Sequence, residues 1–247
     1  MSKERHEVGI SVVLLYHRLG MPRLSSMVAG QYVVPQLFRS QLDCLSMHGW
    51  RCAPLLDVAK RVQSGDHPSD NEFVITFDDG YSSVYKHAIP EICRRGMSAT
   101  VFVVAGAIGG INEWDYKIGD RQEQIMSAQQ IREISDLGLE IGSHTLTHPH
   151  LTSLDEQALK RELIDSKHKL EDLIGKEVAG FSYPYGDYDE RVLAATATAG
   201  YKYAVSTRLG AVGKANVYEI PRVNVRWSAV GPLLMRKIAR ARQISEL

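Results

Sequence analysis

The sequence lacks several features that assign a chain quickly to a class of protein. Its three cysteines, Cys44, Cys52 and Cys93, have no Cys-x-x-Cys spacing, so neither a disulfide framework nor a cysteine zinc site is predicted. It has no excess charge, because 29 Lys and Arg residues balance 29 Asp and Glu residues. A chain without net charge has no general attraction to nucleic acid or to an anionic membrane, so partners must be inferred from local sites.

A long hydrophobic run is also missing. The first apolar stretch, residues 10–16, is too short for the core of a signal peptide and far too short to cross a bilayer. We therefore expect no transmembrane segment and a cytoplasmic location. The sequence contains no indication of the oligomeric state.

What the sequence does contain is an alternation of short apolar runs and amphipathic segments. The apolar runs predict buried strands at 10–16, 73–77, 100–104, 139–143, 180–183 and 203–205. Helical periodicity predicts helices at 35–48, 55–62, 84–95, 127–137, 154–174 and 190–199, and a further one at 233–241. A capping box at 153–156 is expected to begin the fifth helix.

This alternation predicts the fold class. Strands that alternate with helices form parallel βαβ units with right-handed crossovers. The 247 residues contain no linker, repeat or low-complexity stretch, so we expect a single α/β domain that comprises residues 1–247. The same continuity favours a closed or nearly closed barrel rather than an open sheet. In either architecture, chemistry belongs at the carboxyl ends of the strands.

Two acidic residues directly follow the strand predicted at 73–77. Asp78 and Asp79 precede Gly80, which permits a tight turn, so both carboxylates would emerge at the edge where loops converge. An ordinary Asp-Gly turn is the alternative. Adjacent carboxylates at a sheet end are costly unless a cation or a hydrogen-bond donor compensates them, and this favours a functional site.

A histidine pair follows the strand predicted at 139–143. Pro149 disfavours helix at His148, so His144 and His148 are expected on a loop. With nine histidines in the chain, such a pair also arises by chance. Two imidazoles and one Asp at strand ends nevertheless supply the three ligands of a catalytic zinc site, and the second Asp can serve as a base.

Three further strand ends carry candidate residues. After the strand at 180–183, Pro184 and Gly186 fix an irregular turn that can present a backbone N–H to an oxyanion, with a purely structural turn as the alternative. His17 follows the first strand. Arg222 ends another short apolar run and could orient a carboxylate through a bidentate contact.

Three motifs in this order resemble those of the polysaccharide deacetylase family, carbohydrate esterases that share the NodB homology domain. They are TFDDG at 76–80, SHTLTHPHL at 143–151 and YPYG at 183–186, and the resemblance extends from LLYHRLG at 14–20 to IPRVNV at 220–225. It implies a distorted (β/α) barrel of about seven parallel strands. It also implies a metal-dependent hydrolase that removes N-acetyl or related acyl groups from an amino-sugar glycan or its precursor.

The resemblance also implies roles for particular residues. Asp78 matches the position of the catalytic base. The ligands of a divalent metal, most commonly zinc, are matched by Asp79, His144 and His148. Tyr185 matches the residue whose backbone N–H helps to bind the oxyanion.

The chain departs from the family pattern in two places. The third motif of the family usually has an Arg two residues before the Pro, where this chain has Ser182, and Arg222 is the expected replacement. The late His that serves as the general acid is also missing, because no His follows His168. His17 is the expected replacement, since LLYHR resembles members in which the order of the barrel elements is shifted.

Residues 112–115, with the sequence NEWD, resemble a substrate loop of the same members. Trp114 could stack on a sugar there, and a Trp partly buried under a long loop is the alternative. Two other functions stay open at this point. One is an amidohydrolase that acts on a small non-sugar amide, because a fold does not determine the substrate. The other is a carbohydrate-binding protein that has lost catalysis.

Overall fold

Parallel strands form the centre of the molecule. The computed structural model describes residues 9–22, 25–66, 71–117, 119–213 and 216–245. Its main sheet has the order β10-β1-β5-β6-β7-β8-β9, and β4 pairs with β5 beside this path. These strands are β1 Ser11–Tyr16, β4 Arg51–Cys52, β5 Glu72–Phe77, β6 Thr100–Val103, β7 Glu140–Ser143, β8 Gly180–Ser182, β9 Tyr203–Val205 and β10 Val223–Asn224. A small second sheet pairs β2 Arg18–Leu19 with β3 Tyr32–Val33.

The main sheet curls until its two ends approach each other. At one end, β10 pairs with β1, with Leu14 opposite Val223. At the other end, a parallel bridge joins Val205 of β9 to Ile220, in the segment that leads into β10. The chain between β9 and β10 therefore spans the gap, and the distorted (β/α) barrel of about seven parallel strands is confirmed.

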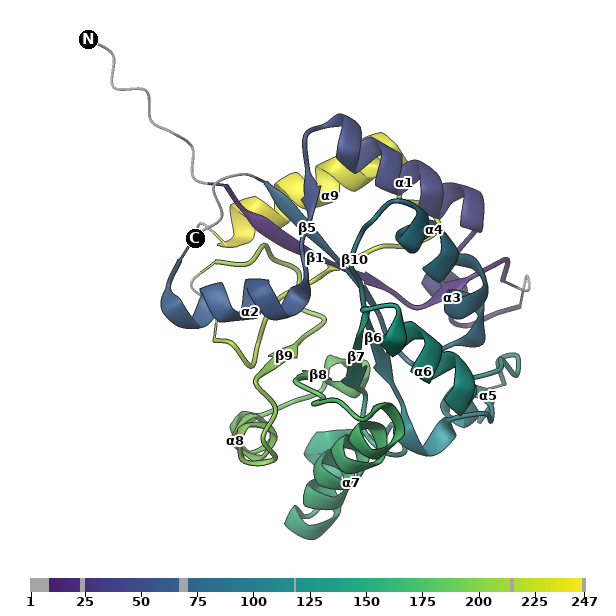
Figure 1. Ribbon diagram of the computed structural model, residues 1–247, viewed down its shortest axis with the longest axis vertical. Coiled ribbons are helices and arrows are strands. Elements are labelled where there is room, and N and C mark those ends of the chain that lie inside the picture. Colours follow the sequence, from purple (N-terminus) through teal and green to yellow (C-terminus); the bar gives the residue numbers. More distant parts are fainter. Residues whose placement is uncertain (1–8, 23–24, 67–70, 118, 214–215, 246–247) are drawn as a thin grey trace.

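Helices surround this barrel (Figure 1). They are α1 Pro35–Met47, α2 Leu55–Ser64, α3 Ser82–His87, α4 Ile89–Arg94, α5 Glu113–Tyr116, α6 Ala128–Asp136, α7 Glu156–Ile174, α8 Glu190–Thr198 and α9 Gly231–Ser245. Short 3-10 turns lie at Ala29–Gln31, Ala105–Ala107, Leu151–Ser153 and Pro184–Gly186. The predicted C-terminal helix packs on its own barrel, since α9 lies beside α1 and buries Leu234, Ile238 and Ala241. Within the described part of the chain, no helix is both long and apolar enough to cross a membrane.

The core explains why the strand predictions agree with the structure. All six residues of β1 are buried, and five of the six residues of β5 are buried beside them. A parallel sheet covered by helices on its outer face and filled on its inner face needs such continuous apolar runs. The apolar strands therefore place their polar successors, Asp78 and His144, at one end of the barrel.

Two helix starts differ from the prediction. The helix expected at 84–95 is divided into α3 and α4, because Pro90 lacks an N–H and is accommodated only in the first turn of a new helix. The capping box expected at 153–156 is wrong: Ser153 lies in a 3-10 turn, and Asp155 caps α7 by accepting from the Ala158 N–H. A capping box occurs instead at the start of α6, between Ser127 and Gln130.

Glu140, at the start of β7, offers a test of the barrel packing. Its carboxylate accepts hydrogen bonds from Tyr203 (2.7 Å) and Thr100 (2.8 Å), and burial raises its pKa. A carboxyl group whose pKa rises on folding favours the folded state at low pH and loses that contribution as the pH rises through the folded pKa.

We therefore predict that Glu140→Gln flattens the pH dependence of stability. Above the unfolded pKa of about 4.3, the unfolding free energy of the wild type should fall with rising pH relative to that of the variant. Urea unfolding from about pH 4.5 to pH 8 measures the difference. A difference that stays constant with pH would contradict a raised pKa at Glu140.

Candidate metal centre

The structure brings the three predicted metal ligands together. Asp79 follows β5, while His144 and His148 follow β7. Oδ1 of Asp79 lies 3.2 Å from Nε2 of His144 and 3.4 Å from Nε2 of His148, and all three side chains are buried. Ligands about 2.1 Å from one tetrahedral ion are about 3.4 Å apart, so these spacings fit a shared cation.

The protonation of His144 supports this fit. Its Nδ1 lies 2.7 Å from the carbonyl oxygen of Ser182, which can only accept, so Nδ1 carries the proton. In the neutral ring, the lone pair of Nε2 then faces the Asp79 carboxylate, an arrangement that a cation between them would stabilise. Burial raises the pKa of Asp79, but the adjacent imidazoles of His144 and His148 outweigh it and hold this pKa well below the usual value.

Aromatic packing holds His148. The Trp114 ring stacks on its imidazole at 4.6 Å between centroids, with an interplanar angle of 23°. The Tyr185 ring meets it edge-on, also at 4.6 Å. Nδ1 of His148 is buried and has no hydrogen-bond partner among the described residues. The orientation of this ligand therefore depends on ring contacts, whereas that of His144 depends on a hydrogen bond.

Unusual backbone conformations concentrate at the site. In the described part of the chain, positive φ angles outside glycine occur only at Asp79, Thr145, His148 and Tyr185. Non-glycine residues adopt this conformation at a cost, and such residues cluster at functional sites. The histidine loop is held by Glu162 of α7, whose carboxylate accepts from the N–H groups of Leu146 (2.8 Å) and Thr147 (2.9 Å).

Asp78 has a different set of partners. Arg222 donates from Nη1 to Oδ1 (2.8 Å) and from Nη2 to Oδ2 (2.7 Å), which is the bidentate contact that the sequence suggested. Ser182 adds a hydroxyl donor to Oδ2 at 3.1 Å. Burial raises the pKa of Asp78, but the charge of Arg222 outweighs burial and lowers it below the usual value. Asp78 is therefore ionised at neutral pH.

The other predicted residues also reach the cleft. His17, Trp114 and Tyr185 line a cavity of about 70 Å³ together with the four residues Asp78, Asp79, His144 and His148. Nδ1 of His17 is buried and has no partner among the described residues, and burial lowers the pKa of this histidine. Pro184 is buried at the start of the turn that gives Tyr185 its φ of 59°.

The sequence did not reveal a buried ion pair beside the cleft. Arg18 pairs with Asp115, which also accepts hydrogen bonds from the Tyr81 hydroxyl (2.7 Å) and from Asn112 (3.1 Å). The Arg18 guanidinium lies over the Tyr81 ring at 4.3 Å. This network links β2 to α5 and so supports Trp114. One feature of the sequence could have indicated this ion pair. Arg18 directly follows His17 and Asp115 directly follows Trp114, so two residues of opposite charge stand next to predicted site residues.

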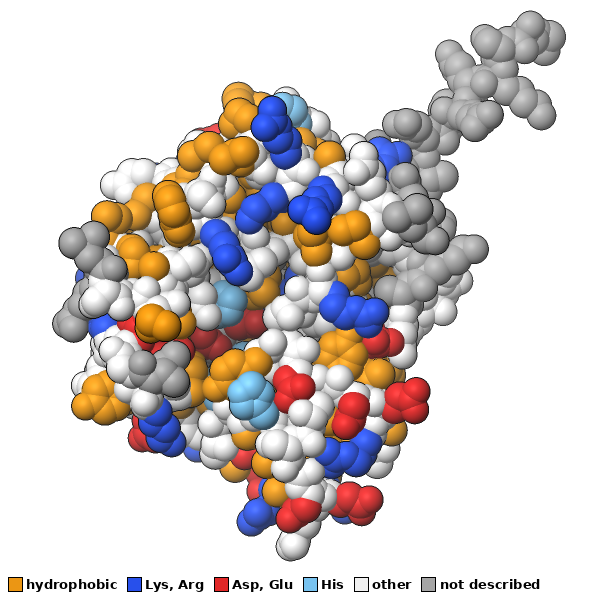
Figure 2. Space-filling model, turned by 180° about the vertical axis from the view of Figure 1, so that it is seen from behind, with side chains coloured by type: hydrophobic (Ala, Val, Ile, Leu, Met, Phe, Trp, Pro, Cys, Tyr) orange, Lys and Arg blue, Asp and Glu red, His pale blue; other side chains and the backbone are white. Residues whose placement is uncertain are grey.

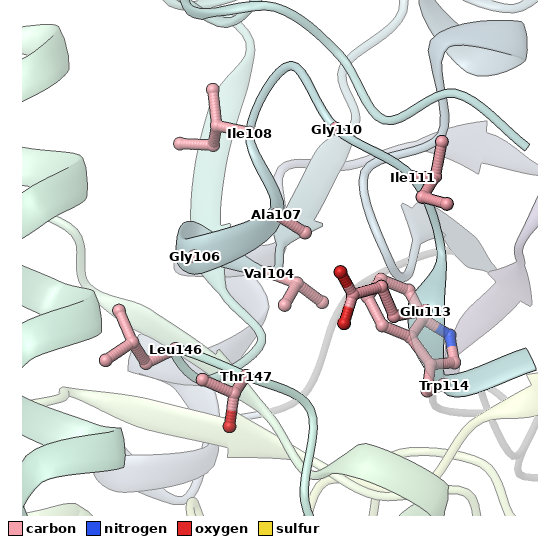
Figure 3. A pocket seen from close by; sticks show the side chains of 10 residues that line it. All are labelled: Val104, Gly106, Ala107, Ile108, Gly110, Ile111, Glu113, Trp114, Leu146 and Thr147. Atoms are coloured by element: carbon pink, nitrogen blue, oxygen red, sulfur yellow. The ribbon is translucent and has the colours of Figure 1, made fainter. Parts of the chain in front are cut away.

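Two larger cavities flank the cleft. One has a volume of about 210 Å³, and Trp114 lines both this cavity and the cleft. The Glu113 carboxylate points into this cavity across from Thr147 (Figure 3). The other, of about 360 Å³, shares His17, Gln31, Tyr185 and Thr207 with the cleft. Figure 2 shows acidic and histidine side chains in a hollow, with Lys and Arg side chains along one side of it. The candidate metal centre therefore lies between two open spaces.

A parallel barrel, an ionised carboxylate and a ligand set suited to a divalent cation define a barrel hydrolase. Residues 65–204 match the family model for polysaccharide deacetylases, which is more than half of the chain. The chain belongs to the polysaccharide deacetylase family. The predicted class of enzyme, which acts on carbon–nitrogen bonds other than peptide bonds, is confirmed.

Relatives and solved structures agree with this assignment. YxkH of Bacillus subtilis strain 168 is 29% identical over 189 residues, which cover 76% of this chain but only 63% of YxkH, less than two thirds of it. The poly-β-1,6-N-acetyl-D-glucosamine N-deacetylase of Staphylococcus epidermidis is 25% identical over 252 residues, covering 94% of this chain and 84% of that protein.

Two solved structures share the fold over nearly the whole chain. Streptococcus pyogenes deacetylase PplD superposes with a TM-score of 0.80 at 22% identity, covering 94% of this chain and 99% of PplD. IcaB from Ammonifex degensii superposes with a TM-score of 0.76 at 25% identity, covering 93% of this chain and 97% of IcaB.

We predict that removing one imidazole of the group removes metal binding. His148→Ala should weaken Zn²⁺ binding by more than about 100-fold. Loss of a residue that only supports a ligand typically costs about 10- to 100-fold, and loss of a ligand should cost more. Calorimetric titration with Zn²⁺ and metal analysis after dialysis measure it. His150→Ala is the matched control, because His150 is 61% exposed and lies outside the group. Stoichiometric zinc in His148→Ala would refute the assignment.

Proposed function

We propose that this protein is a metal-dependent deacetylase that removes N-acetyl groups from an amino-sugar glycan. The observation that carries the proposal is the ligand group Asp79, His144 and His148 beside the Arg222-bound Asp78 in one cleft. The S. epidermidis relative is named for deacetylation of poly-β-1,6-N-acetyl-D-glucosamine, which supports a related substrate here. One carboxylate and two imidazoles are ligands that catalytic zinc sites use, and zinc is the metal that we propose.

The two adjacent carboxylates would have separate tasks. A divalent ion held by Asp79 and the two histidines would polarise the acetyl carbonyl and lower the pKa of water to about 7. Asp78 would accept the proton of that water, since it is ionised and its orientation is fixed by two hydrogen bonds from Arg222. Asp79 would be committed to the metal ion together with the two imidazoles, so it would not be free to accept this proton.

Two more groups would complete the reaction. The backbone N–H of Tyr185 lies in a turn that lines the cleft, and it would donate to the oxyanion of the tetrahedral intermediate. His17, in its protonated form, would give a proton to the departing amine, since it lines the same cleft and its buried Nδ1 has no partner among the described residues. Acetate and a free amine on the sugar are the products.

The two flanking cavities favour a glycan over a small amide. A cleft that adjoins cavities of about 210 Å³ and 360 Å³ has room for further sugars next to the reacting one. An amidohydrolase for small amides would not use these spaces. A carbohydrate-binding protein without catalysis would not need Asp78 ionised beside a ligand group. The cytoplasmic location stays a prediction.

The function is tested by acetate release from a panel of chitooligosaccharides, poly-β-1,6-linked N-acetylglucosamine, peptidoglycan fragments and small amides. We predict release from at least one acetylated amino-sugar oligomer, loss of release after chelation, and recovery when Zn²⁺ is added back. Release that is insensitive to thorough chelation would contradict metal dependence. Acetate release from small amides alone would contradict the proposed glycan substrate and would support the alternative, an amidohydrolase that acts on small amides.

We predict that His17→Gln lowers kcat by about 10²- to 10⁴-fold, the usual contribution of a general acid, while zinc content is unchanged. Steady-state kinetics and metal analysis on one preparation measure both. Gln31→Ala is the control, since Gln31 lines the same cleft but cannot transfer a proton. Wild-type turnover in His17→Gln across neutral pH would remove His17 from the reaction.

A further inference from the structure

We propose that the cavity of about 360 Å³ on the His17 side of the cleft binds an anionic group of the substrate glycan, with Arg226 as the main recognition residue. This inference rests on the proposed deacetylase function and names the class of glycan more closely. The cavity is continuous with the cleft, because both share His17, Gln31, Tyr185 and Thr207. A group bound there would belong to the reacting sugar or to its neighbour.

Strand pairing puts Arg226 beside His17. The register of β1 and β10 sets Leu15 opposite Asn224, and the Val225 N–H continues the pairing by donating to the Leu15 carbonyl (2.9 Å). His17 and Arg226 each lie two residues further along, just beyond the ends of the two strands, and both line the cavity together with Leu15 and Asn224. Neighbouring strands are about 4.8 Å apart, so the two side chains leave adjacent strand ends.

The charge of Arg226 at this wall is not neutralised, and a second cation, Lys237, lies near it outside the cavity lining. Among the described residues, no carboxylate forms an ion pair with Arg226 or Lys237. Lys237 of α9 donates to the carbonyl oxygen of Asn224 at 3.1 Å. Its pKa is lowered, first by burial and then by the nearby charge of Arg226. Two neighbouring cations without a counter-ion repel each other, and a bound anion would relieve that repulsion.

The Arg226 side chain lies near the 3-10 turn Ala29–Gln31. A Cβ added to Gly30 would lie 3.5 Å from Cδ and 3.7 Å from Nη1 of Arg226, so the side chain passes close to this glycine. Gly30 also lines the cavity. Arg226 therefore lies at the cavity wall beside Gly30, and it is exposed to solvent, where a bound anion can reach it.

The other cavity that adjoins the cleft has the reverse charge. Glu113 is the charged residue that lines it, and the carboxylate points into the space (Figure 3). An anionic substituent would be repelled there and attracted beside Arg226. The difference would give the glycan one direction across the site.

Guanidinium recognises carboxylate and phosphate alike, through two parallel N–H donors. The shared chemistry is an anionic oxygen group on the glycan, either a carboxylate carried as an ether on the sugar or a phosphate ester. A neutral polymer of N-acetylglucosamine would leave Arg226 without a partner. We therefore expect the enzyme to prefer an anionic glycan over a neutral one of equal length.

The test compares three oligosaccharides of equal length: neutral N-acetylglucosamine, the same chain with alternating carboxylate-bearing N-acetylmuramic acid, and a chain with a phosphate ester. For the wild type, KM for one anionic chain should be about 10- to 100-fold lower than for the neutral chain, the effect of a charged hydrogen bond. Arg226→Gln should lose this preference, so that its KM for the anionic chain rises to its KM for the neutral chain. Which anionic chain is preferred identifies the source of the anion.

Arg208→Gln is the matched control. Arg208 is also an exposed arginine, but it is paired with Glu219 (3.0 Å) and the Tyr188 hydroxyl (3.0 Å), so its loss should leave the preference intact. The preference should also weaken with salt. Equal KM values for all three chains in the wild type, or an unchanged preference in Arg226→Gln, would overturn the inference.

Failure of the proposed function would look different. If no chain releases acetate from the zinc-loaded protein, the deacetylase proposal fails, but binding can still be measured. Calorimetry of the same oligosaccharides with the wild type and Arg226→Gln then decides the matter. Tighter binding of an anionic chain that depends on Arg226 supports the anion site, and binding that ignores both charge and Arg226 contradicts it.

Discussion

Two neighbouring carboxylates must stay ionised inside a buried cleft, and the bidentate contact of Arg222 with Asp78 makes this possible. The arginine follows Pro221 at the start of β10, and β10 reaches the site only because it pairs with β1 at the closing edge of the barrel. Removing one partner of a buried ion pair typically costs about 3–5 kcal/mol, so barrel closure and the charge of Asp78 are coupled. Asp79, with φ 72°, turns to the histidines instead.

The contacts around the site also explain why it tolerates strained backbone conformations. Four non-glycine residues with positive φ lie in the three motif loops, and each loop is fixed by the structure around it. Glu162 of α7 holds the loop that carries His148, and the buried Pro184 begins the turn of Tyr185. Strain of this kind persists only where surrounding contacts determine the conformation. The apolar strands therefore contribute to catalysis by giving these loops a rigid base.

Much of this could be predicted from local sequence, since strands with continuous apolar runs end just before Asp78 and His144. Arg222 could be proposed from chemistry, because an ionised buried Asp needs a bidentate donor. The ion pair of Arg18 with Asp115 could not be predicted, because only tertiary contacts join residues so distant in sequence. Trp114 was expected either to stack on a sugar or to lie partly buried under a long loop; its contact with His148, which the structure shows, was not foreseen, and sugar stacking stays a prediction. Two-residue strands such as β10 are too short to have a recognisable period.

The central claim is that Asp79 holds the metal ion while Asp78 moves the proton. It is tested most directly by metal content and acetate release measured together in Asp78→Asn and Asp79→Asn. We predict that Asp78→Asn binds zinc like the wild type and loses turnover, whereas Asp79→Asn loses both zinc and turnover. Loss of zinc from Asp78→Asn, or turnover near the wild-type rate in that variant, would contradict the division of roles between the two carboxylates.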